Sequence, residues 1–410
     1  MAIRERLYPD QKSATMMLKH CADARFVWNL GLEQRNLWVR HRSARITSTS
    51  QQKELAEARR EVAWLRQGSS PVQQAALRDL DRAFQNWWKN PTHFSRPTWR
   101  KAGLHEGFYI RDLTVQRINR HWGEVLVPKC GMVRFKISRQ WSEIESTTSA
   151  RVTLDRSGRW HVSFTAPQPS FNWEGTGAIV GLDMGIAQSV TTSDGRHLNM
   201  PKLLSPGETQ RKRRLQRQLS RQHKGSKRRA ATKHQVAVLC AREADRRKDW
   251  IEKTTTELVR EFDLLVIENL KVKSMVRSAK GTIQSPGKNV KAKSGLNRSI
   301  HSQAWGMFRQ RLSDKAGAAT SPVEIIVINP AYTSQRCSGC GHTAKNNRES
   351  QEVFLCQSCA YTDNADVNAA KNILAAGLAV SGRGGASPAK STTTQHSDPT
   401  KRQPLVGAAA

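Results

Sequence analysis

The sequence predicts a multidomain α/β protein, and three observations support this fold class. Apolar residues recur every three or four positions from about residue 10 to residue 100, which predicts helices. From about residue 105 to 166 the period changes to two, which predicts strands. After residue 170, short apolar runs typical of buried strands are separated by helical segments, and two CxxC pairs follow. The 410 residues are enough for two or three domains.

The helical region contains one segment with a clear start signal, "SPVQQAALRDLDRAFQNWWK". Ser70 as N-cap and Pro71 at the first helical position predict where it begins. One face of this segment is apolar and predicts a buried stripe, formed by Leu77, Leu80, Phe84 and Trp87. Trp87 and Trp88 adjoin Lys89, so these indoles suit either base stacking or packing in the core.

The strand region reads as hairpins. In "ARVTLDRSGRWHVSFTAP", residues Val152 and Leu154 alternate with polar residues, Ser157-Gly158 forms the turn, and Trp160 begins the return strand. A second strand pair is predicted in "GEVLVPKCGMVRFKI". We expect a small β-barrel or sheet that also includes the chain start near Tyr8, which makes the helical region an insertion.

The third region alternates strands and helices. Buried strands are predicted at Ala178–Leu182, in "FDLLVIENL" and in "VEIIVINP", and Asp194-Gly195 is a hairpin-turn signal. Helices are predicted in "SIHSQAWGMFRQRL" and "ADVNAAKNILAAG". The segment from Ser274 to Gly295 is rich in Gly, Ser and Lys and predicts a loop, and the tail from about Ser381 predicts disorder.

The charge indicates a polyanionic partner. The chain carries 67 Lys and Arg against 34 Asp and Glu, a formal net charge of +33. A helical stretch from Arg211 to Lys233 holds eleven basic residues and no acidic one. Such an excess suits contacts with nucleic-acid phosphates, with a solvated basic surface as the alternative. We expect no membrane-spanning helix and no signal peptide, because no apolar run is long enough.

Four of the seven cysteines lie in two CxxC pairs separated by fifteen residues: Cys337, Cys340, Cys356 and Cys359. Two such pairs supply the four thiolates of a tetrahedral Zn²⁺ site. A redox pair would need only one CxxC. Since the four cysteines fill the coordination shell, we expect the zinc to be structural, and we expect the protein to reside in a reducing compartment.

Three acidic residues stand in similar contexts. Asp183 ends the apolar run "IVGLD", Glu268 ends "LLVIE", and Asp366 begins the last helix. Taken singly such acids are common, and Asp366 alone would suit a helix cap. Brought together, they would repel one another unless cations lay between them, and carboxylates suit Mg²⁺ or Mn²⁺. Two such ions can activate water for phosphodiester hydrolysis.

Four motifs occur in the order "GLDMG", "VIENLKVKSM", "YTSQRCSGCG" and "DNADVNAAKNIL". Together with "RLYPDQ" and "RFVWNLGLEQRN" near the start, they make the chain similar to TnpB, the transposon-encoded family related to type V CRISPR effector nucleases. The resemblance implies a RuvC-like nuclease of RNase H fold, in which Asp183, Glu268 and Asp366 hold the catalytic metals. Asp363 competes for the third place; Asp366 is preferred because it lies two residues before Asn368.

The resemblance also implies function and partners. We expect a Mg²⁺-dependent endonuclease that cleaves double-stranded target DNA with a guide RNA, as a protein monomer in the prokaryotic cytoplasm, at the nucleoid when bound to DNA. A nuclease-inactive RNA-guided DNA-binding regulator is the alternative, although such descendants usually lose acids of the trio. A DNA-joining transposase is disfavoured because the chain shows no paired His of a tyrosine nuclease.

The implied domain boundaries are these: residues 1–10 as the first part of a small β-barrel wedge domain, 11–104 as a helical recognition lobe, 105–170 as the rest of the wedge, 171–334 as the RuvC-like domain, 335–362 as a zinc-ribbon insert, 363–380 as the final RuvC-like segment, and 381–410 as a disordered tail.

Overall fold

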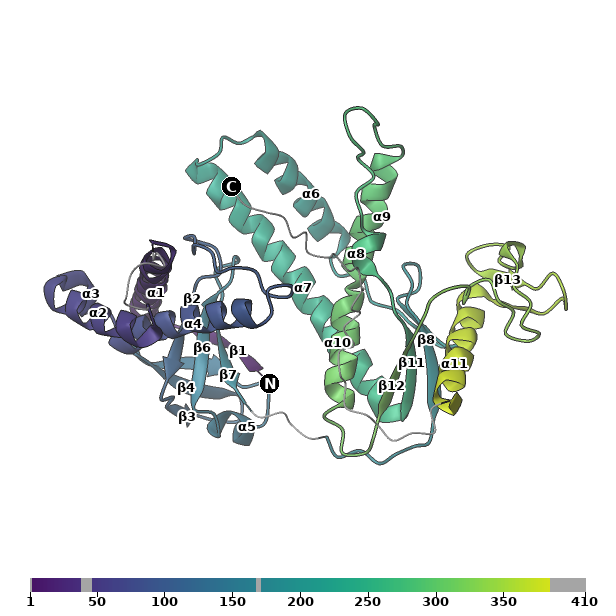
Figure 1. Cartoon of the computed structure of the whole chain (residues 1–410), viewed down its shortest axis with the longest axis horizontal. Coiled ribbons are helices and arrows are strands. Elements are labelled where there is room, and N and C mark those ends of the chain that lie inside the picture. The colour runs from purple at the N-terminus through teal and green to yellow at the C-terminus, as the bar shows by residue number, and fades with distance from the viewer. Residues whose placement is uncertain (1, 38–45, 167–170, 384–410) are drawn as a thin grey trace, which may run out of the picture. The chain divides into compact units, whose positions relative to one another are not determined.

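The computed structural model describes residues 2–37, 46–166 and 171–383. The described chain forms two compact units (Figure 1). Unit 1 contains the residues up to 175 together with 200–260 and 306–322. Unit 2 contains 176–199, 261–305 and the described residues from 323 onward. The mixed α/β class predicted from the sequence is therefore confirmed, and each unit is described by itself below.

Unit 1 is built on a seven-stranded antiparallel sheet in the order β2-β6-β7-β1-β5-β4-β3. Its strands are β1 (Ala2–Tyr8), β2 (Gly107–Arg111), β3 (Val115–Arg117), β4 (Trp122–Val127), β5 (Gly131–Lys136), β6 (Ser149–Leu154) and β7 (Trp160–Thr165). The predicted hairpin is confirmed, because β6 pairs with β7 and Val152 lies opposite Val162. The strand pair β4–β5 is also confirmed.

Strand β1 lies inside this sheet, between β5 and β7. The helical residues that follow β1 therefore intervene between strands of one sheet, as expected from the sequence. The helices are α1 (Gln11–Leu37), α2 (Ser48–Glu61), α3 (Ala63–Gln67), α4 (Ser70–Lys89) and the short α5 (Trp141–Glu145). Helices α1 and α4 pack on each other and on β2 (Figure 1).

The start of α4 differs from the prediction by one residue. The N-cap is Ser69, and Ser70 is the first helical residue. The side chain of Ser69 makes no capping hydrogen bond. The fixed φ of Pro71 suits the first turn of a helix, so the helix can begin here without a side-chain cap. The predicted apolar face is confirmed for Leu77, Leu80 and Phe84, which are buried, whereas its fourth member, Trp87, is only partly buried.

The basic stretch forms two helices rather than one. Helix α6 (Pro206–Arg221) begins with a capping box in which Ser205 and Glu208 bond each other's backbone N–H groups, and α7 spans Lys227–Glu261. The break contains Gly225 at φ +90°, a left-handed conformation that favours glycine and ends helical continuity. Helix α10 (Trp305–Ala316) is joined to α7 by Arg311, which pairs with Glu252 at 2.7 Å.

Unit 2 contains a five-stranded sheet in the order β10-β9-β8-β11-β12. Its strands are β8 (Ile179–Asp183), β9 (Val190–Thr192), β10 (His197–Leu198), β11 (Leu264–Glu268) and β12 (Glu324–Ile328). Strand β11 runs parallel to both β8 and β12, whereas β9 is antiparallel to β8 and β10. The carboxyl ends of three parallel strands therefore meet at one edge of the sheet.

The remaining elements of unit 2 are α8 (Val272–Met275), α9 (Val290–Gln303), α11 (Ala365–Arg383), the 3₁₀ turn η1 (Lys345–Asn347), and a small hairpin of β13 (Val353–Leu355) and β14 (Thr362–Asn364). The predicted bounds of the loop from Ser274 to Gly295 are wrong at both ends, because α8 covers its first residues and α9 covers its last. Helix α11 also continues past Ser381, and residues 384–410 of the predicted tail lie outside the described part of the chain.

Helix α11 packs directly on β8, β9, β11 and β12 (Figure 1). Two glycines permit this close approach. A Cβ added at Gly181 in β8 would lie 2.2 Å from the carbonyl oxygen of Ala370, and one at Gly377 would lie 2.5 Å from Val266. Ile373 of α11 forms one buried apolar cluster with Val266 of β11 and Ile326 of β12.

Replacing Gly181 by Ala is expected to destabilise unit 2 by about 1–3 kcal/mol, because the new methyl group would meet the backbone of α11 rather than a side chain that can rotate away. Gly382→Ala in the same helix is the matched control, since nothing lies within 4 Å of its added Cβ. Urea unfolding of the two variants measures the effect. Equal stability of both would show that α11 can shift without cost.

None of the helices in the described ranges has the length and apolar character needed to cross a membrane.

Candidate active site

The sheet and α11 bring the three predicted acidic residues to one region of unit 2. Asp183 is the last residue of β8 and Glu268 the last of β11. These strands are parallel neighbours with Leu182 opposite Ile267, so the two acids follow adjacent register positions. Asp366 is the second residue of α11, which packs on both strands. Residues separated by nearly half the chain thus converge.

The N-cap of α11 is not Asp366. The side-chain Oδ1 of Asn364 accepts hydrogen bonds from the backbone N–H groups of Asp366 (3.0 Å) and Val367 (3.2 Å). The Asp366 carboxylate is therefore not needed as a cap. It accepts a hydrogen bond of 3.0 Å from the guanidinium of Arg348 instead.

The electrostatics show that the trio is close. Burial and, after it, the negative charges of Glu268 and Asp366 together raise the pKa of Asp183 to about 7, while Arg348 opposes this rise. Burial also raises the pKa of Glu268, which is only 6% exposed; the hydroxyl of Thr333 opposes this by donating a hydrogen bond of 2.6 Å. A buried carboxyl group and a half-buried one near a third acid form a site where bound cations would relieve repulsion.

Asp363 has a different environment. It accepts hydrogen bonds from the hydroxyl of Tyr361 (2.7 Å) and from Lys371 (2.8 Å). Although partial burial opposes them, these two donors lower the pKa of Asp363. Asp366 is also paired, with Arg348, but its charge raises the pKa of Asp183, which favours Asp366 as the third residue of the trio.

The described residues contain only one group of three or more His, Cys, Asp or Glu side chains that is compact enough for a single metal ion, and it is the cysteine group. The three acids are close enough to shift the pKa of Asp183 but do not form such a group. Their oxygen donors are nevertheless the type that Mg²⁺ and Mn²⁺ prefer.

The pKa of Asp183 predicts a pH effect on stability. Its ordinary value is 3.8, and its folded value is about 7. Because the folded protein binds this proton more tightly than the unfolded chain does, this contribution favours folding at low pH and is lost as the pH rises from about 4 to about 7. Relative to Asp183→Asn, the free energy of unfolding of the wild type should fall by no more than about 4 kcal/mol over this pH range. Urea unfolding across this pH range without Mg²⁺ measures it; identical pH slopes for the two proteins would contradict it.

The four cysteines form the predicted cluster. The sulfur atoms of Cys337 and Cys359 lie 3.7 Å apart, and those of Cys340 and Cys356 lie 3.6 Å apart. A tetrahedral zinc site with Zn–S bonds of about 2.3 Å places its sulfurs about 3.8 Å apart, so the arrangement fits this ion. Backbone N–H groups of Ser358 and Cys359 point at Cys356 Sγ, which stabilises a thiolate there.

Asparagines on α11 connect the cysteine cluster to the helix. Asn368 donates to the carbonyl oxygen of Arg336 (2.8 Å) and accepts from the backbone N–H of Ser338 (2.9 Å). Asn372, one turn later, donates to the carbonyl oxygens of Thr333 and Arg336 at 3.0 and 2.6 Å. Both asparagines are buried, so they fix the start of the insert on α11.

The packing of the insert strengthens this connection. Phe354, Cys337 and Cys356 form one buried cluster with Ala365, the first residue of α11. Sequence reasoning missed Thr333, Arg348, Asn364, Asn368 and Asn372. Of these, only Asn368 and Asn372 could have been suggested by the sequence, because two asparagines four residues apart on a helix share one face.

Three family models match the chain. Residues 161–279 match a family described as "Probable transposase" (OrfB_IS605), residues 305–373 match the Cas12f1-like TNB domain, and residues 1–43 match the helix-turn-helix domain of OrfB_IS605. InsQ of Escherichia coli (strain K12), whose name proposes an RNA-guided DNA endonuclease, is 36% identical over 384 residues, covering 92% of this chain and 92% of that protein.

This chain belongs to the TnpB family of RNA-guided endonucleases. A similarly named protein from Streptomyces pristinaespiralis is 31% identical over 98% of this chain and 96% of its own length. The CRISPR-associated endodeoxyribonuclease Cas12f1 of Sulfoacidibacillus thermotolerans is 45% identical over 73 residues, 17% of each chain.

Solved structures were also compared with this TnpB-family chain. The cryo-EM structure of a CRISPR-Cas12f ternary complex has a TM-score of 0.31 at 15% identity, covering 89% of this chain and 82% of that one. The structure of CasPhi-2 bound to crRNA has a TM-score of 0.41 at 12% identity, covering 92% and 98%. Because both TM-scores are below 0.5, the family assignment rests on the sequence relatives.

Proposed function

We propose that this protein is a transposon-encoded, RNA-guided DNA endonuclease that hydrolyses phosphodiester bonds of target DNA at Asp183, Glu268 and Asp366. One observation carries the proposal: three acids from distant segments converge, in a chain with a net charge of +33. In a protein so poor in acid, this convergence suits cation binding. The names of the full-length relatives support the same activity.

The three carboxylates would hold two Mg²⁺ ions, with Mn²⁺ as the other fitting ion. Bound divalent cations supply an activated water and stabilise the leaving oxygen of the phosphodiester. Thr333 orients the Glu268 carboxylate through its hydrogen bond of 2.6 Å. The capping role of Asn364 leaves Asp366 available as a ligand. The cysteine insert would hold one structural Zn²⁺ and so keep the start of α11 in place.

The fold of unit 2 supports a RuvC-like domain of RNase H type, because β9 and β10 extend a parallel set of strands in which β8 ends at Asp183 and β11 at Glu268. The sheet of unit 1 would be the wedge domain, closing toward a barrel, and α1–α4 the recognition lobe. The boundaries stay as given from the sequence, although α6, most of α7 and most of α10 cluster with unit 1.

Nucleic acids are the proposed partners. A guide RNA pairs with one strand of double-stranded target DNA, and the protein holds the resulting duplex mainly by its backbone. The basic side chains of α6 and the start of α7 would contact these phosphates. The protein would act as a monomer with its RNA, in the prokaryotic cytoplasm and at the nucleoid.

The proposal is tested with the full-length protein and the RNA that copurifies with it. Sequencing this RNA identifies the guide, and a double-stranded DNA carrying the matching target is then incubated with and without Mg²⁺. Cleavage that needs the matched target, the RNA and Mg²⁺ is the expected result. Target binding without any cleavage would support the nuclease-inactive regulator instead, and strand-joining products would support a transposase.

A further inference from the structure

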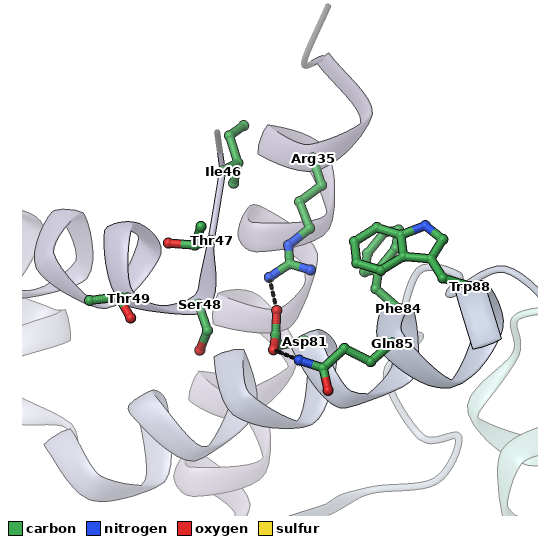
Figure 2. Close-up of a pocket in the computed structure, with 9 residues that line it drawn as sticks. All are labelled: Arg35, Ile46, Thr47, Ser48, Thr49, Asp81, Phe84, Gln85 and Trp88. Atoms are coloured by element: carbon green, nitrogen blue, oxygen red, sulfur yellow. Dashed lines mark hydrogen bonds and ion pairs between the residues drawn. The ribbon is translucent and has the colours of Figure 1, made fainter. Parts of the chain in front are cut away.

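A cavity in the helical part of unit 1 lies apart in sequence from every residue of the acidic site. Its volume is about 580 Å³, within the range of small-ligand sites. Figure 2 shows two facing walls: Phe84 and Trp88 from the end of α4 on one side, and Ile46 to Thr49 at the start of α2 on the other. Arg35 and Asp81 lie between the walls.

The positive charge of Arg35 at the floor of the cavity is balanced by neighbouring groups. Arg35, whose side chain is 6% exposed, pairs with Asp81 at 2.6 Å and also donates to Gln51 at 3.0 Å. Its guanidinium lies 4.9 Å from the centre of the Phe84 ring. Because this cation is already satisfied, the cavity offers no free positive charge to a phosphate and is better suited to a neutral group.

Trp88 presents a flat aromatic surface to this space. It is 60% exposed, whereas the neighbouring Phe84 is 4% exposed. The two ring centres are 5.4 Å apart, so the buried Phe84 supports the exposed indole. Exposed indoles in basic proteins stack well on nucleobases, because every base has a π-face.

One polar group on the wall that carries Trp88 has no hydrogen-bond partner in the described part of the chain. Gln85 donates its Nε2 to Asp81 at 2.7 Å, which leaves its Oε1 free to accept. This oxygen can accept a hydrogen bond from an amino or imino group of a base.

Cations for the neighbouring phosphates lie on α4. Arg82 and Lys89 are exposed and form no ion pair among the residues described. Arg82 is three residues before Gln85, and Lys89 is four residues after it, so all three share one helical face. A nucleotide whose base enters the cavity would therefore have its backbone along a positive edge.

We propose that this cavity binds a single unpaired nucleobase, stacked on Trp88 and hydrogen-bonded by Gln85. The inference rests on the proposed function only in that it takes nucleic acid as the partner. The base could belong to unpaired guide RNA or to single-stranded target DNA, and the chemistry recognised is the same.

The test uses the full chain without Mg²⁺ and two probes: a 12-nucleotide oligo(U) RNA and a 12-nucleotide oligo(dT) DNA, each also made with a photoactivatable 4-thio base. Trp88→Ala should bind at least one probe about 5- to 100-fold more weakly than the wild type, and Trp88→Phe should recover part of the loss. Trp64→Ala is the control, because Trp64 is also exposed (42%) but does not line the cavity. Cross-linked peptides should contain Trp88 or residues 46–49.

The RNA and DNA arms show which nucleic acid supplies the base. Unchanged binding of both probes by a folded Trp88→Ala protein overturns the inference, as do cross-links that all map elsewhere. If Trp88→Ala fails to fold, the positions of the cross-links in the wild-type protein decide whether the cavity binds a base. A wild type that cuts no target but binds a probe through Trp88 contradicts the proposed nuclease and leaves this site standing.

Discussion

Replacing Asp183 by Asn is expected to slow target-DNA cleavage by at least about 1,000-fold while guide-RNA binding remains unchanged, since metal ions contribute several kcal/mol of transition-state stabilisation and the substitution removes a central ligand. Asp183 feels the charges of both Glu268 and Asp366, so its loss would disturb every metal position in the trio. Single-turnover cleavage with saturating Mg²⁺ measures the rate, and a gel-shift assay with the copurified RNA measures binding.

Two comparisons sharpen this experiment. Asp194→Asn is the matched control, because Asp194 lies in the β9–β10 turn of the same sheet and pairs with the exposed Arg196 at 3.0 Å. It should cut at the wild-type rate. Asp366→Asn should be as inactive as Asp183→Asn, whereas Asp363→Asn should keep much more activity. The reverse order for these two variants would move the third position of the trio to Asp363.

Loss of the cysteine site should have the second large effect. Cys356→Ser is expected to lose the bound zinc, unfold the insert and reduce cleavage strongly. Zinc binding contributes about 10–16 kcal/mol in zinc-finger peptides, and the buried cluster of the insert contains little beyond Phe354 and two of the cysteines. Since the same cluster includes Ala365, the start of α11 and the adjacent Asp366 would lose their support.

Metal analysis, hydrogen exchange of residues 337–364 and the cleavage assay check this prediction together. The wild type should contain about one zinc per chain, as expected for a four-cysteine site. Cys240→Ser, at an exposed cysteine of α7 outside the insert, should behave as the wild type does. A Cys356→Ser protein with full zinc content and a protected insert would refute the structural role of the cysteines.

Local patterns predicted the elements of the site well. The apolar runs before Asp183 and Glu268 are β8 and β11, and both acids end their strands. The CxxC spacing predicted the cysteine cluster, and the alternation around Ser157-Gly158 predicted the β6–β7 hairpin. These signals are local because strand alternation, turns and paired metal ligands are written in neighbouring residues.

The ends of the helices, and the break between α6 and α7, were predicted less accurately from the sequence. Gly225 divides the basic segment into α6 and α7, and α9 begins at Val290 inside the predicted loop. Ser69 rather than Ser70 is the cap of α4. Each of these depends on the conformation of one or two residues, for which several neighbouring candidates have similar propensities.

The sequence by itself determined the family, the pairing of the four cysteines and the choice of candidate acids, because these reside in residue type and spacing. Only the tertiary structure decided how the acids are held. Gly181 lets α11 approach β8 closely, Asn364 takes the cap and leaves Asp366 available, and Asn368 and Asn372 fasten the insert to the helix. These roles depend on contacts between segments far apart in the chain, which no local pattern records.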